Sequence, residues 1–115
     1  MIIKRGDIVL TDLEPVLGSE QGKIRPCLVI QNDVSNQFSP VTIVVSLSTK
    51  QFEKEYPTNV TIEPYVGGVR EKSVAICDQI RTVSITNRIK KKLGSVGNET
   101  MKRVDEALKI SLGLN

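Results

Sequence analysis

Short stretches of alternating apolar and polar residues recur along the first two thirds of the chain. In residues 6–13, Ile8 and Leu10 alternate with Val9 and Thr11, a period-two pattern that predicts a strand with at least one buried face. Residues 41–47 are rich in β-branched side chains and have the strongest strand character. Similar patterns predict strands over residues 27–30, 59–62 and 71–77, and residues 78–83 are expected to form a bend followed by a short strand.

The last part of the chain has a different period. Met101, Val104, Leu108 and Leu112 recur at steps of three and four, which predicts one amphipathic helix over residues 98–112, with Asn98 as its N-cap. Five or more short strands followed by one helix are typical of a mainly β fold, a small β-barrel or curled sheet with the C-terminal helix packed against it. A length of 115 residues fits one domain over residues 1–115.

The connections between these elements differ in length and composition. Residues 14–23 carry Pro15, Gly18 and Gly22 among mostly polar residues, in a connection longer than a tight hairpin needs. Long loops of this kind are often functional. Pro26 opens the strand that follows, which is one of the few places where a sheet tolerates proline. Residues 31–40 predict turns with one short helical turn, and Gly67-Gly68 predicts a turn.

Composition agrees with an ordinary soluble globule. Hydrophobic residues make up 39% of the chain and charged residues 25%. The apolar runs are too short to cross a bilayer and the N-terminus lacks the apolar stretch of a signal peptide, so we expect the protein in the cytoplasm. Cys27 and Cys77 are far apart and lack a CxxC context, which favours two reduced, packed thiols over a disulfide or a zinc site.

Charge and the missing histidines restrict the chemistry. The net charge of +3 fits a nucleic-acid ligand without demonstrating one. The basic cluster of residues 88–92 is either a solvated loop or helix end, or a phosphate-binding patch. Because the chain has no histidine, an enzyme built from it cannot use paired imidazoles for acid–base catalysis. Catalysis would depend on arginine, lysine, carboxylates, hydroxyls or cysteine.

Three blocks near the N-terminus carry a specific motif: KRGDIV at residues 4–9, DLEP at residues 12–15 and GSEQGKIRP at residues 18–26. In this order and at this spacing they resemble the N-terminal signature of the MazF/PemK (Kid-like) toxins, the mRNA interferases of type II toxin–antitoxin systems. The likeness continues through residues 28–33, Ser48-Thr49, Pro57-Thr58, residues 78–82 and the terminal helix. It therefore covers nearly the whole chain.

The resemblance implies a fold, an activity and partners. The fold implied is the small SH3-like barrel of the CcdB/PemK/MazF-like toxins, which forms a homodimer. The activity is cleavage of single-stranded RNA at short sequence motifs, without a metal or other cofactor, to leave a 2′,3′-cyclic phosphate and a 5′-hydroxyl. A cognate MazE-like antitoxin neutralises such toxins.

The resemblance also suggests catalytic residues. Arg25 matches the catalytic arginine of the family, and its guanidinium fork suits the phosphoryl oxygens of the transition state. Ser48 stands where closely similar members carry a catalytic threonine, with Thr49 as the competing hydroxyl. Asp78 aligns with an acidic position regarded as catalytic in the Kid-type branch. Since arginine is a reluctant base, Glu20 and Asp78 are both candidate proton acceptors.

Substrate recognition is expected in the loops, because single-stranded RNA is recognised through splayed bases. Several of the candidates also have a structural explanation: glutamine side chains could hold the loop to the barrel, Arg81 could pair with a carboxylate, and Phe52 could pack under its own loop. The predicted RNA-binding residues are Gln21, Lys23, Asn32, Phe52, Gln79 and Arg81.

Two other functions are compatible with the sequence. One is a non-nucleolytic gyrase-poisoning toxin of the CcdB type, and the other is a nucleic-acid-binding SH3-like module without catalysis. A metal-dependent nuclease is disfavoured because the acidic residues form no sequence cluster. Such a site would have to be assembled by the fold from Asp7, Asp12, Glu20 and Asp78.

Overall fold

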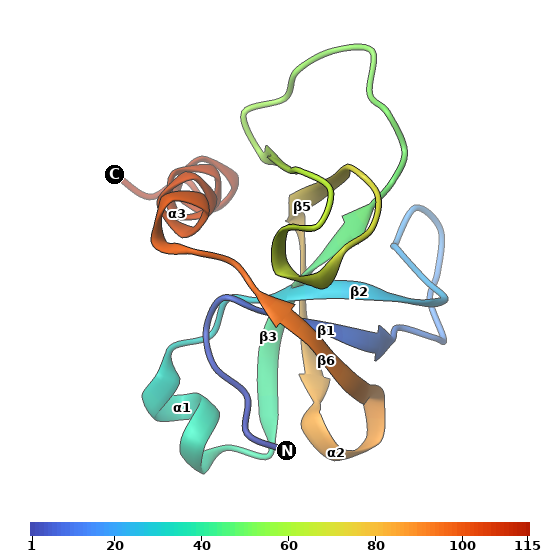
Figure 1. Cartoon of the computed structure of the whole chain (residues 1–115), viewed down its shortest axis with the longest axis vertical. Coiled ribbons are helices and arrows are strands. Elements are labelled where there is room, and N and C mark those ends of the chain that lie inside the picture. The colour runs from blue at the N-terminus through green and yellow to red at the C-terminus, as the bar shows by residue number, and fades with distance from the viewer.

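The computed structural model describes residues 1–115, and its main element is one antiparallel sheet (Figure 1). The strands, in chain order, are β1 (Asp7–Asp12), β2 (Ile24–Val29), β3 (Val41–Ser48), β4 (Asn59–Ile62), β5 (Ser73–Ser84) and β6 (Ile89–Ser95). The helices are α1 (Asp33–Phe38), the short 3-10 turn η1 (Val66–Gly68), α2 (Ile85–Arg88) and α3 (Asn98–Leu112).

The six strands lie in the order β4-β5-β3-β2-β1-β6, so β4 and β6 are the two edges. The sheet curls until η1, which follows β4, contacts β6. Gly68 makes this approach possible, because a Cβ at this residue would stand 2.3 Å from the carbonyl oxygen of Leu93. The predicted mainly β fold, a small barrel-like sheet with a C-terminal helix, is confirmed.

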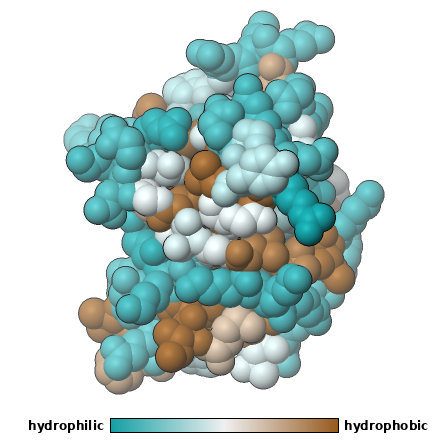
Figure 2. Space-filling view, in the orientation of Figure 1, coloured by the Kyte–Doolittle hydropathy of each residue, from teal (hydrophilic) through white to brown (hydrophobic).

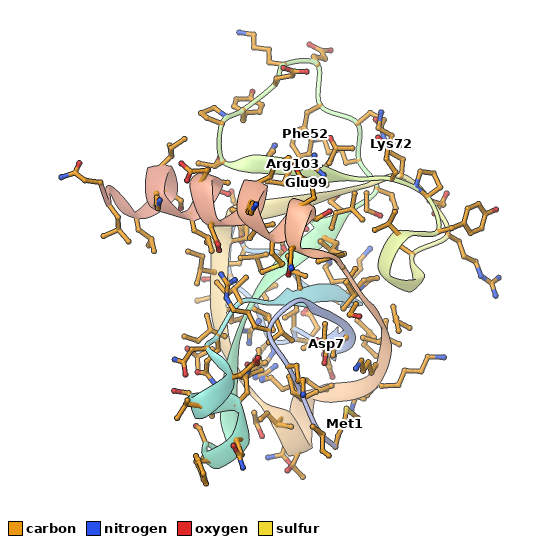
Figure 3. The ribbon with its side chains drawn as sticks, turned by 60° about the vertical axis from the view of Figure 1, so that its left-hand side comes forward. Met1, Asp7, Phe52, Lys72, Glu99 and Arg103 are labelled. Carbon is orange, nitrogen blue, oxygen red and sulfur yellow. The ribbon has the colours of Figure 1, made fainter.

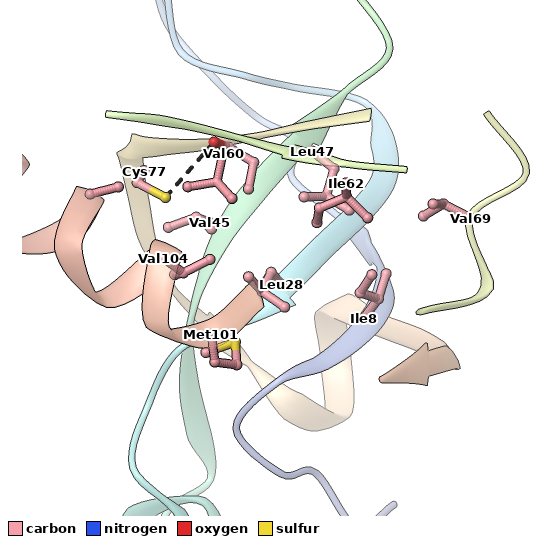
Figure 4. Packing of buried hydrophobic residues seen from close by; sticks show 12 residues of the cluster. Ile8, Leu28, Val45, Leu47, Val60, Ile62, Val69, Cys77, Met101 and Val104 are labelled. Carbon is pink, nitrogen blue, oxygen red and sulfur yellow. Dashed lines mark hydrogen bonds between the residues drawn. The ribbon is translucent and has the colours of Figure 1, made fainter. Parts of the chain in front are cut away.

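Each face of the curled sheet buries its own apolar cluster. Side chains of β3 alternate between them, with Val45 and Leu47 on one face and Val44 on the other. Helix α3 covers the first cluster with Met101, Val104 and Ala107. Figure 4 shows Met101 and Val104 on this helix, facing Leu28 and Val45. The second cluster consists of Ile3, Val9, Leu13, Cys27, Val29, Val44, Val83 and Ile89. Burial on both faces holds β1, β2 and β3 in a fixed register.

Most predicted elements are found at or near the expected residues, including α1 as the short helical turn. The expected division at residue 78 is wrong, since β5 is one strand of 12 residues, but the irregularity expected there is found as a bulge: Val45 pairs with Ile80 and Ser46 with Ile76, which leaves residues 77–79 without a partner on β3. Strand β6 is missing from the prediction because three exposed lysines hide its apolar pattern. Such charge is typical of an edge strand. The basic cluster therefore lies on a strand, with only Arg88 at a helix end.

Two local predictions need correction. Gly97, not Asn98, is the N-cap of α3, and no side chain caps that end. Pro26 lies inside β2 instead of opening it. It pairs with Leu10 of β1, whereas the pairing of β2 with β3 begins only at Cys27. Proline is tolerated because β2 has a single neighbour at this residue.

Both cysteines are free and buried, as predicted. Burial raises the pKa of each thiol to about 12. At neutral pH they are therefore protonated and unsuited to nucleophilic attack. No helix of the structure is long and apolar enough to cross a membrane.

Candidate active site

The pairing of β2 with β3 brings Arg25 and Ser48 to the same place. Cys27 pairs with Ser46 in this antiparallel ladder, and continuing the register by two residues sets Arg25 opposite Ser48. Side chains two residues apart on a strand share a face, so Arg25, Ser46 and Ser48 all lie on the face of the second apolar cluster. The sheet itself therefore assembles the predicted arginine and hydroxyl.

The guanidinium of Arg25 is held on two of its three nitrogens. Nε donates to the carbonyl oxygen of Gly22 at 2.7 Å, and Nη1 donates to Oε1 of Gln21 and, at 3.4 Å, to the carbonyl oxygen of Leu47. Nη2 has no hydrogen-bond partner in the protein. The half-buried side chain is thus fixed in orientation while one nitrogen stays free to donate to an anion.

The connection from β1 to β2 is tied down at its base. Leu13 donates its backbone N–H to the carbonyl oxygen of Lys23 at 2.9 Å, and Lys23 donates its own to Oε1 of Glu14 at 3.0 Å. Arg88 reaches from the end of α2 to the carbonyl oxygens of Asp12, at 3.1 Å, and Glu14. Because the loop supplies two partners of the Arg25 guanidinium, these ties also position Arg25.

A cavity of about 290 Å³ opens beside Arg25. Gln21 connects the two, since its side chain accepts from Arg25 while its backbone donates to Oε1 of Gln79 at 3.3 Å. Arg81 donates to the carbonyl oxygen of Leu13 and so pairs with the main chain instead of a carboxylate. The cavity is lined by Leu13, Glu20, Gln21, Val44, Ser46, Gln79, Ile80 and Arg81.

Ser46 is the lining residue that sequence reasoning missed. It is 3% exposed, and its Oγ is the one buried side-chain oxygen or nitrogen without a hydrogen-bond partner. A buried polar group left unpaired costs about 1–3 kcal/mol, so an orphan hydroxyl in a cavity wall is a candidate ligand contact. The period-two spacing to Ser48 was the signal that could have found it.

The structure separates the two candidate hydroxyls. Ser48 is half-buried at the end of β3, and its Oγ accepts a hydrogen bond from the backbone N–H of Lys50 at 3.1 Å. Thr49 lies one residue beyond the strand and is exposed. By register, only Ser48 lies opposite Arg25.

The two candidate carboxylates also differ in position. Glu20 lines the cavity beside Gln21, and its Oε1 accepts a hydrogen bond from the backbone N–H of Leu17 at 3.0 Å. Asp78 is exposed on β5 and is not part of the cavity lining. Its charge contributes to the raised pKa of Cys77.

Three of the predicted RNA-binding residues lie outside this cavity. Lys23 is exposed at the end of the loop. Asn32 follows the opposite end of β2 and caps α1, where its Oδ1 accepts from the backbone N–H of Ser35 at 2.8 Å. Phe52 lies in the connection after β3, edge-on to Tyr56 with 6.1 Å between ring centroids. The other three, Gln21, Gln79 and Arg81, meet in the cavity wall.

The electrostatics of the site are set by the two arginines. Their positive charges act on the Cys27 thiol from the same face, although burial outweighs them and keeps the pKa of this thiol raised. The cavity lining offers one guanidinium, two carboxamides, a hydroxyl and the carboxylate of Glu20, and the Arg25 guanidinium lies beside it through Gln21. This set suits a ligand that combines a phosphate with hydrogen-bonding edges.

Comparison with known proteins gives a consistent result. The family model for PemK-like, MazF-like toxins of type II toxin–antitoxin systems matches residues 4–112. Endoribonuclease EndoA of Bacillus subtilis (strain 168) is 46% identical over 114 residues, which cover 99% of this chain and 97% of that protein.

Solved structures agree in fold. An endoribonuclease from a Mycobacterial species, in complex with its cognate antitoxin, superposes with a TM-score of 0.79 at 25% identity, over 98% of this chain and 97% of that one. MazF from Deinococcus radiodurans gives a TM-score of 0.82 at 22% identity, over 99% of each chain.

Proposed function

The chain belongs to the PemK-like, MazF-like family of toxins of type II toxin–antitoxin systems, and on that premise we propose that it is an endoribonuclease that cuts single-stranded RNA at short sequence motifs. The observation that carries this proposal is the Arg25 guanidinium, which is fixed on two nitrogens and open on the third, beside a cavity with amide and hydroxyl groups. The gyrase-poison and passive-binding alternatives are not favoured, because a relative of 46% identity is named an endoribonuclease.

The proposed reaction is attack of a ribose 2′-oxygen on the adjacent phosphorus. The phosphoryl oxygens gain negative charge in the transition state, and Nη2 of Arg25 and Oγ of Ser48 donate hydrogen bonds to them. The bond to the 5′-oxygen of the next nucleotide breaks, and this oxygen takes up a proton from water as it leaves. The products are a 2′,3′-cyclic phosphate and a 5′-hydroxyl, and no metal ion takes part.

The proton of the 2′-hydroxyl needs an acceptor other than Arg25. Glu20 is the favoured candidate because it lines the cavity next to Gln21, whereas Asp78 is outside that lining. One oxygen of Glu20 is engaged by the backbone of Leu17, which leaves the other free to accept. A comparison of Glu20→Gln with Asp78→Asn separates the two: the acceptor's variant loses kcat, and the other keeps it.

A base next to the cleaved bond is proposed to enter the cavity. The carboxamides of Gln21 and Gln79 and the hydroxyl of Ser46 offer donors and acceptors to the edge of a base. Arg81 holds the wall through the carbonyl oxygen of Leu13. The unpartnered state of the Ser46 hydroxyl in the free protein supports a role as ligand contact.

The partners are proposed from the family, from the net charge of the chain and from one apolar groove. Structures of toxins of this fold include complexes with their cognate antitoxins, and a net charge of +3 suits an acidic, MazE-like antitoxin for this chain. A homodimer is proposed through the apolar groove of about 630 Å³ between α3 and the sheet. Its apolar lining is Ile30, Ile43, Ile80, Leu108, Leu112 and Leu114. The protein is proposed to act in the cytoplasm, where its RNA substrate and antitoxin are made.

The test is cleavage of a long single-stranded RNA by purified protein in EDTA, with Arg25→Ala as the matched variant. We expect cleavage at a few sites by the wild type only, with 5′-hydroxyl ends that polynucleotide kinase labels without prior phosphatase treatment. Equal cleavage by both proteins, or none by either, overturns the proposal. Trapping of DNA gyrase with intact RNA would support the gyrase-poison alternative instead.

A further inference from the structure

Another cavity, of about 600 Å³, lies at the edge strand β4, on the other side of Ser48 from Arg25. The connection that follows β3, strand β4 and one side of α3 enclose it. Ser48 pairs across the sheet with Val74, and Val74 pairs with Thr61; these last two residues line the cavity. We call this cavity the flank groove. It begins one strand away from the candidate active site.

Four basic side chains line the flank groove, namely Lys54, Lys72, Lys102 and Arg103, and all four are exposed. None of them pairs with a carboxylate, because the three ion pairs of the molecule involve other cations. Figure 3 shows Lys72 and Arg103 near Phe52. Lys72 immediately precedes β5, Arg103 lies on α3, and Phe52 lies in the loop after β3. Three separate segments of the chain thus place basic side chains without a carboxylate partner around one groove.

The groove also contains three carboxylates, Glu55, Glu99 and Glu106. Glu106 accepts a hydrogen bond from Nζ of Lys109 at 3.1 Å, which offsets its charge. Glu99 lies in the first turn of α3, where the helix dipole stabilises a negative charge. The lining therefore stays net positive towards a bound anion.

Two aromatic rings stand over this charge. Phe52 and Tyr56 meet edge to face, with centroids 6.1 Å apart, and Lys50 lies 5.6 Å from the Phe52 ring centre. Tyr56 is 48% exposed. Phe52 is half-buried and supports the Tyr56 ring. An exposed aromatic face beside cationic side chains is the combination that binds single-stranded nucleic acid without reading its sequence. In Figure 2 the projecting loop that carries these rings is covered mainly by hydrophilic side chains, so it is not an apolar docking face.

The spacing fits one continuous strand of RNA. Arg25, Ser48, Val74 and Thr61 occupy four successive strands, so three strand spacings of about 4.8 Å, or about 14 Å in all, separate the first from the last. A few nucleotides cross this distance. The cleaved phosphate at Arg25 and the groove at β4 can therefore be occupied by the same chain.

We propose that the flank groove binds the single-stranded RNA that flanks the cleavage site on one side, with its phosphates on Lys54 and Lys72 and a base on Tyr56. This inference rests on the proposed endoribonuclease function and adds a second, sequence-independent subsite to it. An acidic peptide is the other polyanion that matches the charge. The aromatic platform and the continuity with Arg25 favour RNA.

The test compares two double variants that lose equal charge. Lys54→Gln/Lys72→Gln alters the flank groove, and Lys90→Gln/Lys91→Gln alters exposed lysines on β6, the opposite edge of the sheet. Each protein is assayed on a short RNA that holds only the mapped cleavage motif, and on RNAs extended at the 5′ or the 3′ side. Thermal unfolding checks that all three proteins are equally folded.

We expect the groove variant to lower kcat/KM about tenfold on one extended RNA, through KM, and to leave the short RNA unchanged. Each lost phosphate contact should reduce the slope of log kcat/KM against log salt by about 0.7, or by about 1.4 for the pair. The β6 variant should keep the wild-type slope. A 4-thiouridine in the affected flank should cross-link to Tyr56 or to residues of α3.

Several results would overturn the inference. Equal losses from both double variants would show a general effect of charge, and a loss on the short RNA would place these lysines in the reaction itself. Binding of a polyglutamate peptide in place of an oligouridine would assign the groove to a protein partner. If the wild type cuts no RNA at all, the proposed function fails, whereas normal cleavage without any flank effect rejects the groove alone.

Discussion

The two ends of strand β3 carry polar side chains on the same face of the sheet, yet they differ in how these side chains are paired. At the α1 end, Thr42 and Gln31 both donate to Oδ1 of Asn36, at 2.7 and 2.9 Å, and Nδ2 of Asn36 donates to the carbonyl oxygen of Gln31 at 2.9 Å. At the other end, the hydroxyl of Ser46 has no partner and Arg25 keeps one nitrogen free.

This difference distinguishes a polar cluster that stabilises the fold from one that is prepared for a ligand. Buried polar groups are almost always paired, because an unpaired group costs free energy and a paired network specifies one arrangement. The Asn36 cluster satisfies its members within the protein. At the Arg25 end, the hydroxyl of Ser46 and one nitrogen of Arg25 remain free to form hydrogen bonds with RNA. Changes at the two ends should therefore affect different measurements.

The largest expected effect is the loss of cleavage in Arg25→Ala. Removing one preorganised donor to an anionic transition state slows a reaction by about a hundred- to a thousandfold, and the variant should stay as stable as the wild type because the side chain is only half-buried. Single-turnover cleavage and thermal unfolding measure the two quantities. Arg25→Lys keeps the charge but not the fork, so it should recover little of the rate. Full recovery would show that charge alone is needed.

The matched change at the other end is Asn36→Ala. It leaves Gln31 and Thr42 without their buried partner, so we expect a loss of about 3 kcal/mol in the free energy of unfolding, measured in urea. Below the unfolding transition, cleavage per folded molecule should equal that of the wild type. A variant that unfolds normally but no longer cuts RNA would refute the division between the two ends.

Ser48→Ala should reduce the cleavage rate by about tenfold, the equivalent of one hydrogen bond to a charged group. Ser48→Thr retains the hydroxyl and should retain most of the rate. Thr49→Ala serves as the control, since Thr49 lies beyond the strand. If Thr49→Ala is the slower of the two alanine variants, the register argument for Ser48 is wrong.

Ser46→Ala should change selectivity more than stability. Removing a hydroxyl that has no partner is expected to leave the free energy of unfolding unchanged or to raise it by up to about 1 kcal/mol. Sequencing of RNA 5′-ends should show weaker preference at one position of the cleavage motif. An unchanged motif would mean that no base contacts this hydroxyl.

The smallest effect concerns Cys27, which lies on β2 between the two ends. Burial raises the pKa of its thiol from the ordinary value of 9.0 to about 12. Above pH 9 the unfolded chain gains stability by losing the proton, while the folded state does not. Stability should therefore be constant below pH 9 and fall between pH 9 and pH 12. Cys27→Ala should show a shallower fall in alkaline unfolding experiments, and an identical profile would contradict the assignment.

Sequence alone predicted the elements whose apolar pattern is regular. The period-two stretches gave most of the strands, and the three- and four-residue steps in the tail gave α3 with its observed bounds. Strand β6 was missed because Lys90, Lys91 and Lys92 stand at an exposed edge, where burial does not impose alternation. The continuity of β5 depends on its pairing with β3, which is a long-range property.

The cavity residues that carry a family motif were predicted, and Ser46, which carries none, was missed. Arg25, Glu20 and Gln21 belong to one motif, whereas Gln79 and Arg81 join them from a strand nearly sixty residues away in the chain. Ser46 carries no motif, and only its burial without a hydrogen bond identifies it. Asn32 lies within the motif region but caps α1, because an asparagine before a helix pairs with the first free N–H groups.

The most direct test of the contrast between the two ends is one ¹H–¹⁵N spectrum of the side-chain amide and guanidinium groups, recorded with an RNA whose cleavage site carries a 2′-deoxy nucleotide. We expect the signals of Arg25 Nε, Gln21 and Gln79 to shift on binding, while the carboxamide signals of Gln31 and Asn36 do not move. Shifts confined to Gln31 and Asn36, or no shifts at Arg25 under saturating RNA, would contradict this expectation.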